Sequence, residues 1–294
     1  MKAEDLHALS PREDRRAGAI LGLAVGDALG ATYEFCSPNE IPEGPLEMVG
    51  GGWLDLEPGE TTDDTALTKA VLKAYDDRGS LDLRRVRDEM LRWQDTRPKD
   101  IGNQTRKALN YLREHPEALS LPEDSDAQGN GAVMRAAPHG VKTRDANEAV
   151  DNAWREAGLT HPSWESRASS GLVAALTAHL INGKRPEEAL EGSFSFLEIK
   201  NESGKQVRET LRPLERYEHN PGGWTIYTTR LALLCLLDTR EFRSGVETLV
   251  RLGGDADTNA AVAGALLGAL FGVKDIPLEW LESLRDRDTL LAML

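Results

Sequence analysis

The chain has 294 residues, 40% of them hydrophobic, and a formal net charge of −14 at pH 7. This length is sufficient to bury a sizeable core within one domain, and the acidic balance argues against binding to nucleic-acid phosphates or anionic membranes, although it also simply favours solubility. Because Cys36 and Cys235 are the only cysteines, neither a disulfide framework nor a cysteine-based zinc site is expected.

Two segments bear on where the protein acts. The N-terminal segment is charged and lacks the apolar core of a signal peptide. The longest apolar stretch, residues 260–273, is too short and too rich in small residues to span a bilayer. We therefore expect a cytoplasmic protein that does not insert into membranes.

Helical periodicity runs through the whole chain. In chain order, we expect helices over residues 11–31, 64–77, 83–95, 103–114, 146–157, 163–181, 186–197, 225–237, 242–252, 258–271 and 277–285. Pro186 and Pro277 have the character of first-turn prolines, and Ser163 and Thr62 that of N-caps.

Other local patterns are scarce. Alternating strand patterns are absent from the sequence, no internal repeat stands out, and the stretches 37–59 and 219–223 are typical of loops within a domain. The sequence therefore predicts a single compact all-α multi-helix domain over residues 1–294. We expect about ten flexible residues at its N-terminus and a monomer.

Glycines recur at every fourth position of the first predicted helix, at Gly22, Gly26 and Gly30. The spacing differs from that of a dinucleotide-binding fingerprint, and no strand precedes it. Such glycines lie on one helical face, where a second helix can approach closely. The same spacing recurs at Gly264, Gly268 and Gly272. We therefore expect these two helices to pack together and to bring their acidic ends into one crevice.

Two acidic clusters that also contain hydroxyl residues adjoin apolar helical patterns, one at residues 61–65 and one at 253–259. Like charges beside an apolar helix repel one another and resist burial, and a divalent cation would relieve both effects. Carboxylate and hydroxyl oxygens suit hard ions such as Mg²⁺ or Mn²⁺, not zinc or copper. The clusters therefore predict one oxygen-ligated metal site assembled from two remote segments.

Other interpretations of these clusters fit less well. The second cluster begins like a calcium EF-hand loop, but Ala260 and Leu266 occupy positions that require Gly and Glu. The first begins like the aspartate-rich motif of all-α isoprenoid synthases, but Leu67 occupies a position that requires Asp. Simple helix capping, with carboxylates favoured by the helix dipole, is the remaining alternative.

Four motifs follow one another in a specific order. They are GDALG at 26–30, TDDT at 62–65, GNG at 129–131 with Met134 and Arg135, and GGDADT at 253–258. Further segments are GATYEF at 30–35, RPKDIGN at 97–103, and Gly223 with Trp224. Together, over residues 15–272, they resemble the ADP-ribosylglycohydrolase family, and within it the dinitrogenase reductase-activating glycohydrolases. The resemblance implies an all-α fold and two divalent cations, Mg²⁺ or Mn²⁺. It also implies an enzyme that cleaves the N- or O-glycosidic bond between ADP-ribose and a side chain.

The resemblance also implies roles for individual residues. The implied metal ligands are Thr62, Asp63, Asp64, Asp255, Asp257 and Thr258. Asp100 becomes the acid/base, and Glu34 the second candidate, as a gate or metal-linked carboxylate. Such roles agree with the chemistry, because hydrolysis at the anomeric carbon needs a positioned water and a carboxylate that handles protons. Two metals about 3.5–4 Å apart can clamp ribose hydroxyls and orient the water.

The substrate contacts are also assigned by resemblance. The implied substrate-binding residues are Asn103, Gly129, Asn130, Gly131, His161 and Trp224. The loop at 129–131 could offer backbone N–H groups to a diphosphate, although Asn-Gly also marks ordinary turns. His161 matches a position that contacts ADP-ribose in relatives, and Trp224 either lines the ribose pocket or packs in the core.

Three functions are compatible with this sequence. In the first, the protein is a hydrolase that acts on an ADP-ribosylated protein and releases ADP-ribose, with an arginine linkage favoured over serine and other linkages. In the second, it is a metal-dependent hydrolase of a small ADP-ribose ester or another nucleoside derivative. In the third, it is a non-catalytic relative that binds ADP-ribose. The intact ligand set and Asp100 favour an enzyme over the third function.

Overall fold

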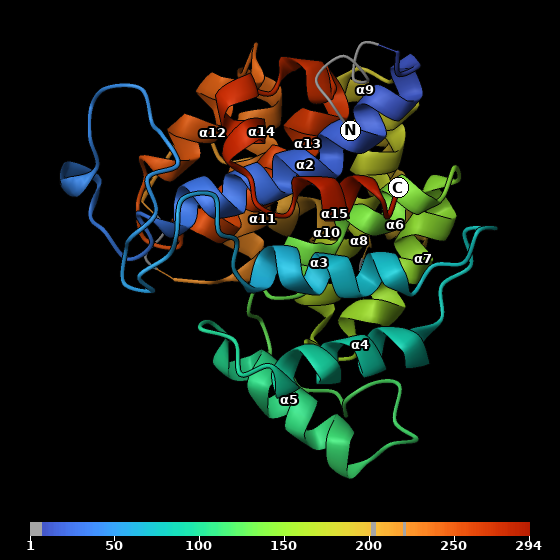
Figure 1. The fold of residues 1–294 in the computed structure, drawn as a ribbon. Helices are drawn as coiled ribbons and strands as arrows, with labels where there is room; N and C mark the ends of the chain where they lie inside the picture. The colour runs from blue at the N-terminus through green and yellow to red at the C-terminus, as the bar shows by residue number, and fades with distance from the viewer. Residues whose placement is uncertain (1–7, 201–203, 220–221) are drawn as a thin grey trace.

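The structure is a computed structural model that describes residues 8–200, 204–219 and 222–294 (Figure 1). Within these ranges the chain forms helices joined by loops, with isolated β-bridges and no β-strand. The predicted all-α fold with a single compact domain is thus confirmed. Across the same ranges, no helix combines the length and the apolar character needed to cross a membrane. The flexibility expected of the N-terminus concerns mainly residues 1–7, which lie outside the described residues.

The longer helices of the first half are α2 (Pro11–Ala31), α3 (Asp63–Lys73), α4 (Leu83–Asp95), α5 (Asn103–Glu114) and α7 (Ala146–Ala157). Those of the second half are α8 (Trp164–Ile181), α9 (Pro186–Lys200), α10 (Gly204–Leu211), α11 (Thr225–Asp238), α12 (Phe242–Val250) and α13 (Ala256–Phe271). Short helical segments are η1 (Pro38–Glu40), η2 (Val133–Arg135), α6 (Ala137–Lys142), η3 (Val273–Asp275), α14 (Leu278–Ser283) and α15 (Arg287–Leu291).

The predicted helices all exist, and the differences lie at their ends. The helix expected over 64–77 stops at Lys73, because the Asp76 carboxylate accepts hydrogen bonds from the N–H groups of Arg78 (2.9 Å) and Ser80 (2.8 Å) and closes a turn. The helix expected over 277–285 is shorter, and Pro277 occupies its N-cap position, not its first turn. The short helices α6, α10 and α15 were not predicted, since five to eight residues carry too little periodicity to detect.

The two N-cap predictions have different outcomes. The Ser163 hydroxyl accepts a hydrogen bond from the Ser166 N–H at 3.2 Å, so this cap is confirmed. Thr62 occupies the N-cap position of α3, but its side chain makes no capping bond to that helix. The Thr62 hydroxyl instead donates a hydrogen bond to the Asp27 carboxylate on α2.

Helices α2 and α13 lie against each other in an antiparallel pair, as Figure 1 shows near the top of the molecule. A Cβ atom on Gly22 would overlap the carbonyl oxygen of Gly264, and one on Gly26 would overlap that of Ala260. The predicted close packing of these helices is therefore confirmed. Gly272 is an exception, because it follows α13 with a φ of 90° and faces the side chain of Asp14.

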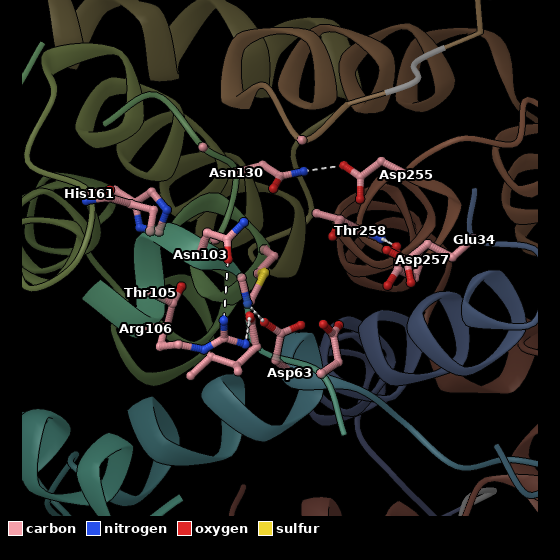
Figure 2. A pocket seen from close by; sticks show the side chains of 18 of the residues that line it. Glu34, Asp63, Asn103, Thr105, Arg106, Asn130, His161, Asp255, Asp257 and Thr258 are labelled. Atoms are coloured by element: carbon pink, nitrogen blue, oxygen red, sulfur yellow. Dashed lines mark hydrogen bonds between the residues drawn. The ribbon is translucent and has the colours of Figure 1, made fainter. Parts of the chain in front are cut away.

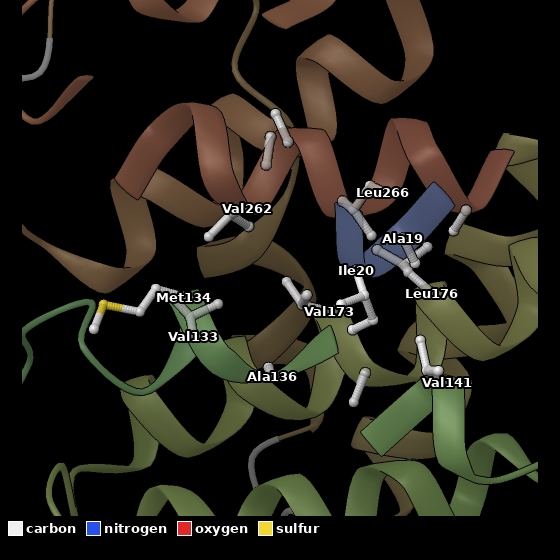
Figure 3. Close-up of a cluster of buried hydrophobic side chains, with 14 of the residues drawn as sticks. Ala19, Ile20, Val133, Met134, Ala136, Val141, Val173, Leu176, Val262 and Leu266 are labelled. Carbon is white, nitrogen blue, oxygen red and sulfur yellow. The ribbon is translucent and has the colours of Figure 1, made fainter. Parts of the chain in front are cut away.

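The hydrophobic core surrounds this helix pair. Figure 3 shows side chains of α2, α8, α13 and the η2–α6 segment that meet in one buried cluster. Ile20, Leu176 and Leu266 are fully buried within it. Helix α8 is buried along most of its length and packs against both α2 and α13. The ends of the pair are thereby fixed in position.

We predict that Gly22→Leu destabilises the protein by about 3 kcal/mol or more, since the new side chain meets a backbone that cannot move aside. The matched control is Gly44→Leu, because a Cβ at Gly44 has no neighbour within 4 Å. That control should change the free energy of unfolding by less than about 0.5 kcal/mol. Urea unfolding of the two variants measures the difference, and equal stabilities would contradict the packing argument.

Candidate active site

The candidate site lies where three helix ends meet. Because α2 and α13 are antiparallel, the C-terminal end of α2 lies beside the start of α13, and the start of α3 joins them. The six predicted metal ligands are all buried at this junction, and the hydroxyl of Thr258 donates to Asp64 Oδ2 at 3.3 Å. The structure therefore brings together two segments that are 194 residues apart.

Asp27 organises the first of these segments. Its carboxylate is fully buried and accepts hydrogen bonds from the backbone N–H groups of Thr62 (3.0 Å) and Thr65 (3.0 Å) and from their hydroxyls (2.9 and 2.6 Å). Asp27 thus caps α3 from another helix. Burial raises the pKa of Asp27 to about 6, although these hydrogen bonds oppose the increase. Because Asp27 supplies the cap of α3, helix capping does not explain the acidic residues of the first cluster.

Asn130 holds the second segment. Its Nδ2 group donates one hydrogen bond to Asp255 Oδ2 and another to Thr228 Oγ1 at 3.1 Å. Its backbone N–H donates to the Gly223 carbonyl at 2.9 Å. The donors of Asn130 are therefore engaged by the protein itself, and in this arrangement Asn130 fixes the Asp255 carboxylate.

Glu34 reaches the acidic cluster from the segment that follows α2. One ligand oxygen each of Glu34, Asp255 and Asp257 lies within 4.8 Å of the others. The Trp53 indole N–H donates to Glu34 Oε2 at 2.5 Å. The pKa of Glu34 rises to about 8, chiefly because it is buried and additionally because Asp100 and Asp255 are negatively charged. Without a cation, Glu34 is therefore protonated at neutral pH.

A pair of backbone hydrogen bonds ties the Glu34 segment to the second cluster. The Phe35 N–H donates to the Gly254 carbonyl at 2.6 Å, and the Gly254 N–H donates to the Cys36 carbonyl at 2.9 Å. Gly253 and Gly254 have φ angles of 64° and 65°, in the left-handed region that glycine adopts without steric cost. The two glycines therefore permit the tight turn that places Asp255 beside Glu34.

The carboxylates of this crevice disfavour one another's charge. Burial, and then the neighbouring carboxylates, raise the pKa values of Asp63, Asp64 and Asp257 well above their usual range. Burial also raises the pKa values of Asp255 and Asp100. Asp64 Oδ1 is buried and has no hydrogen-bond partner among the described residues. An oxygen-only donor set with an unpartnered buried carboxylate oxygen fits a hard divalent cation.

A cavity of about 600 Å³ opens beside the acidic cluster (Figure 2). The predicted site residues that line it are Glu34, Asp63, Asp100, Asn103, Gly129, Asn130, Gly131, His161, Asp255, Asp257 and Thr258. Its volume lies in the range of small-molecule sites. The cavity is also lined by residues to which the sequence analysis gave no site role, among them Phe35, Trp53 and Arg106. In the sequence, nothing about these residue types distinguishes them from ordinary surface residues of a loop or helix.

Three predicted site residues do not line this cavity. Thr62 borders a neighbouring cavity of about 480 Å³ that shares Asp63 and Asp100, and Asp64 is fully buried behind the cluster. Trp224 is 45% exposed, and its indole N–H donates to Gln128 Oε1 at 2.9 Å. Core packing therefore does not explain Trp224. Its contact with a ribose stays a prediction, because it is not among the described residues that line the larger cavity.

His161 is held by a chain of buried hydrogen bonds. Arg135 pairs with Glu156 (Nε to Oε1, 2.9 Å) and donates from Nη2 to Thr160 Oγ1 at 2.6 Å, and this hydroxyl lies 2.8 Å from His161 Nδ1. A guanidinium can only donate, so the Thr160 oxygen accepts from it and its hydrogen is available for Nδ1. Burial, aided by the Arg135 charge, lowers the pKa of His161 to about 3. The ring is therefore neutral, and this arrangement leaves the proton on Nε2.

The Nε2 side of His161 faces the loop at 129–131. A Cβ atom on Gly129 would lie 3.1 Å from Nε2, and one on Gly131 would lie 2.8 Å from Cε1. Any larger residue at these two positions would press on the ring. The two glycines thus allow the imidazole edge and the loop backbone to share one wall of the cavity.

Comparisons with known proteins identify relatives that match nearly the whole chain. The family model described as ADP-ribosylglycohydrolase matches residues 8–294. The chain is 35% identical to ADP-ribosyl-[dinitrogen reductase] glycohydrolase of Rhodospirillum rubrum, over 95% of this chain and 96% of that protein. It is 31% identical to ADP-ribosylarginine hydrolase Tri1 of Serratia proteamaculans, over 92% of this chain and 75% of that protein. A solved structure titled ADP-ribosylglycohydrolase-related protein complex has a TM-score of 0.80 and 33% identity, and the match covers 97% of each chain.

The raised pKa values predict how stability depends on pH. A carboxyl whose folded pKa exceeds its unfolded value binds its proton more tightly in the folded state, so stability is lost as pH rises from the unfolded value toward the folded one. With unfolded values near 4 and Glu34 at about 8, the melting temperature of the metal-free protein should fall between about pH 5 and pH 8. Calorimetry in EDTA measures this fall.

Added Mn²⁺ should raise the melting temperature, and the increase should grow over the same pH range because the cation binds deprotonated carboxylates. Asp257→Ala should remove most of this increase. Glu279→Ala is a matched control, because Glu279 is an acid on α14, remote in sequence from the cluster and not among the residues that line the cavity. A melting temperature insensitive to Mn²⁺ at every pH would exclude a cation site here.

Proposed function

The chain belongs to the ADP-ribosylglycohydrolase family, whose members are glycosidases, and on that premise we propose that it removes ADP-ribose from a modified protein side chain, with arginine as the favoured acceptor. The observation that carries the proposal is the convergence of two remote acidic segments beside a cavity of about 600 Å³, with a buried Asp64 oxygen that has no hydrogen-bond partner in the described part of the chain. The names of the relatives from Rhodospirillum rubrum and Serratia proteamaculans support a protein substrate and an arginine linkage.

We infer that the crevice holds two divalent cations, Mg²⁺ or Mn²⁺. The residues that would hold them are Thr62, Asp63, Asp64, Asp255, Asp257 and Thr258. When bound, such cations supply positive charge to the crowded carboxylates and Lewis acidity toward the ribose hydroxyls. This charge also favours the deprotonated state of the carboxylates, which burial alone opposes.

The proton transfers fall to Asp100. In the reaction the bond from ribose C1 to the acceptor atom breaks and water adds to C1, which gives ADP-ribose and the unmodified side chain. Asp100 lines the cavity beside Asp63, and its pKa is raised by burial, so it can carry a proton to the leaving group. Its carboxylate then accepts a proton from the attacking water. Glu34 is the second candidate, because its pKa of about 8 also allows it to hold a proton near neutral pH.

The wall of the cavity that contains His161 and the loop at 129–131 binds the nucleotide. His161 offers its Nε2–H to an oxygen of ADP-ribose, and Asn103, Gly129 and Gly131 offer polar groups around it. The backbone N–H of Asn130 is used within the protein, so Asn130 acts by positioning Asp255. We also propose that the protein is cytoplasmic and monomeric.

The experiment that tests the function compares linkages. The protein is incubated with arginine-, serine- and ester-linked ADP-ribose, with Mg²⁺, Mn²⁺ or EDTA, and free ADP-ribose is measured. We expect release from the arginine linkage that EDTA reduces to background. Release from a small ADP-ribose ester alone would identify the second candidate function. Binding of ADP-ribose without release from any linkage would indicate a non-catalytic relative, and full activity in EDTA would contradict the metal dependence.

Asp100→Asn separates binding from chemistry. It preserves the shape of the side chain but removes its titratable group, so kcat should fall about 10²- to 10⁴-fold while the affinity for free ADP-ribose barely changes. Glu34→Gln is the comparison, since a residue that faces Asp255 and Asp257 should alter the Mn²⁺ dependence as well. Near-normal turnover of Asp100→Asn would transfer the acid/base role to Glu34.

A further inference from the structure

Two aromatic side chains lie exposed at the mouth of the cavity. Phe35 is 63% exposed and Trp53 is 53% exposed, and both line the cavity. Their ring centroids are 5.4 Å apart with an interplanar angle of 47°. We call this pair the aromatic ledge. Large aromatic rings normally contribute to a core, so a pair left open to solvent beside a catalytic cavity indicates a binding surface.

The ledge is fixed at some cost to the local backbone. Phe35 has a φ of 63°, a left-handed conformation that is rare for a bulky residue. The hydrogen bond from its N–H to the Gly254 carbonyl holds it there, and the indole N–H of Trp53 is held by Glu34. Backbone strain of this kind persists where the surroundings impose it, and it concentrates at functional sites.

The position of the ledge identifies which part of the substrate reaches it. Figure 2 shows His161 and Glu34 on opposite sides of the view, with Asp63, Asp257 and Thr258 between them. If ribose C1 lies over the acidic cluster and the nucleotide extends toward His161, the acceptor side chain leaves on the Glu34 side. The ledge adjoins Glu34 directly, through Phe35 in the chain and through Trp53 by its hydrogen bond.

We propose that the aromatic ledge of Phe35 and Trp53 binds the acceptor side chain, by stacking against the planar guanidinium of an ADP-ribosylated arginine. This inference rests on the proposed function and specifies its acceptor subsite. A guanidinium stacks on aromatic faces and is attracted electrostatically to them. Lys99 also lines the cavity, but its ammonium group is engaged by Glu60 (3.0 Å) and by the Asp55 carbonyl (3.1 Å). A serine acceptor has no planar group that could stack.

The test measures selectivity between two peptides that differ only in an arginine- or a serine-linked ADP-ribose. Phe35→Leu keeps an apolar side chain but removes the aromatic face, and it should lower the ratio of kcat/KM for arginine over serine about five- to tenfold. Phe35→Tyr keeps the face and should preserve the ratio. Because the Leu and Tyr variants share the same unusual backbone, their difference reports the ring.

Two further variants control for folding and location. Phe35→Asn suits the left-handed backbone and also lacks the ring, so it replaces Phe35→Leu if that variant does not fold. Val49→Ala changes an exposed apolar residue of the same connection that is not among the described residues lining the cavity, and its ratio should match the wild type. Trp53 variants are less decisive, because they also release Glu34.

The outcomes separate the ledge from the proposed function. An unchanged ratio in Phe35→Leu, or an equal loss in Phe35→Tyr, would overturn the ledge. A weaker affinity for free ADP-ribose in Phe35→Leu would place the adenine, not the acceptor, on these rings, and would overturn it as well. If the wild type does not cleave the arginine-linked peptide, the proposed linkage fails. The ledge is still tested in that case, because calorimetry then measures the affinity of each variant for the intact peptide.

Discussion

The direct backbone contact between α2 and α13 is the constraint on which the site depends. With glycines at the crossing positions, the two helices approach until the carbonyl oxygens of one fill the space where the other would carry Cβ atoms. This distance fixes the end of α2 beside the start of α13. Asp27 on α2 then holds the start of α3 through hydrogen bonds from four donor groups of Thr62 and Thr65. Helix packing and hydrogen bonds with N–H and O–H groups thus locate the acidic segments at 62–65 and 255–258.

In their charged form, the buried carboxylates of the crevice lower the stability of the folded state. The raised pKa values show that burial and mutual repulsion disfavour the charged form of these carboxyls, even though several of them accept hydrogen bonds, and the fold nevertheless keeps them buried. Such an arrangement is typical of sites in which stability is given up for function. The contrast with Glu156 is informative, because that buried carboxylate has a guanidinium partner and a lowered pKa. The protein can pair a buried acid with a basic side chain, but among the described residues Asp63, Asp64, Asp255 and Asp257 form no such ion pair.

Much of this structure could be predicted from the sequence, and the limits are physical. Periodicity of 3.6 residues predicted the long helices, and glycine spacing predicted the α2–α13 contact, because both are local properties of the chain. The roles of Asp27 and Trp53 could not be predicted in this way. Asp27 caps a helix 35 residues away, and Trp53 orients Glu34 from 19 residues away, so neither partner is visible in a local pattern. Family resemblance assigned the predicted site residues, but it gave no account of these supporting contacts.

The hydrogen bond between Thr258 and Asp64 has a consequence for how the protein is made. It joins residues separated by 194 positions, and contacts of such long range form late because closing the intervening loop costs entropy. During synthesis, the first acidic cluster emerges long before its counterpart exists. It follows that the full set of six predicted ligands is not available to a cation during the early steps of folding. The candidate site is completed only after α13 has left the ribosome and docked, so a product terminated before Asp255 lacks half of the predicted ligands.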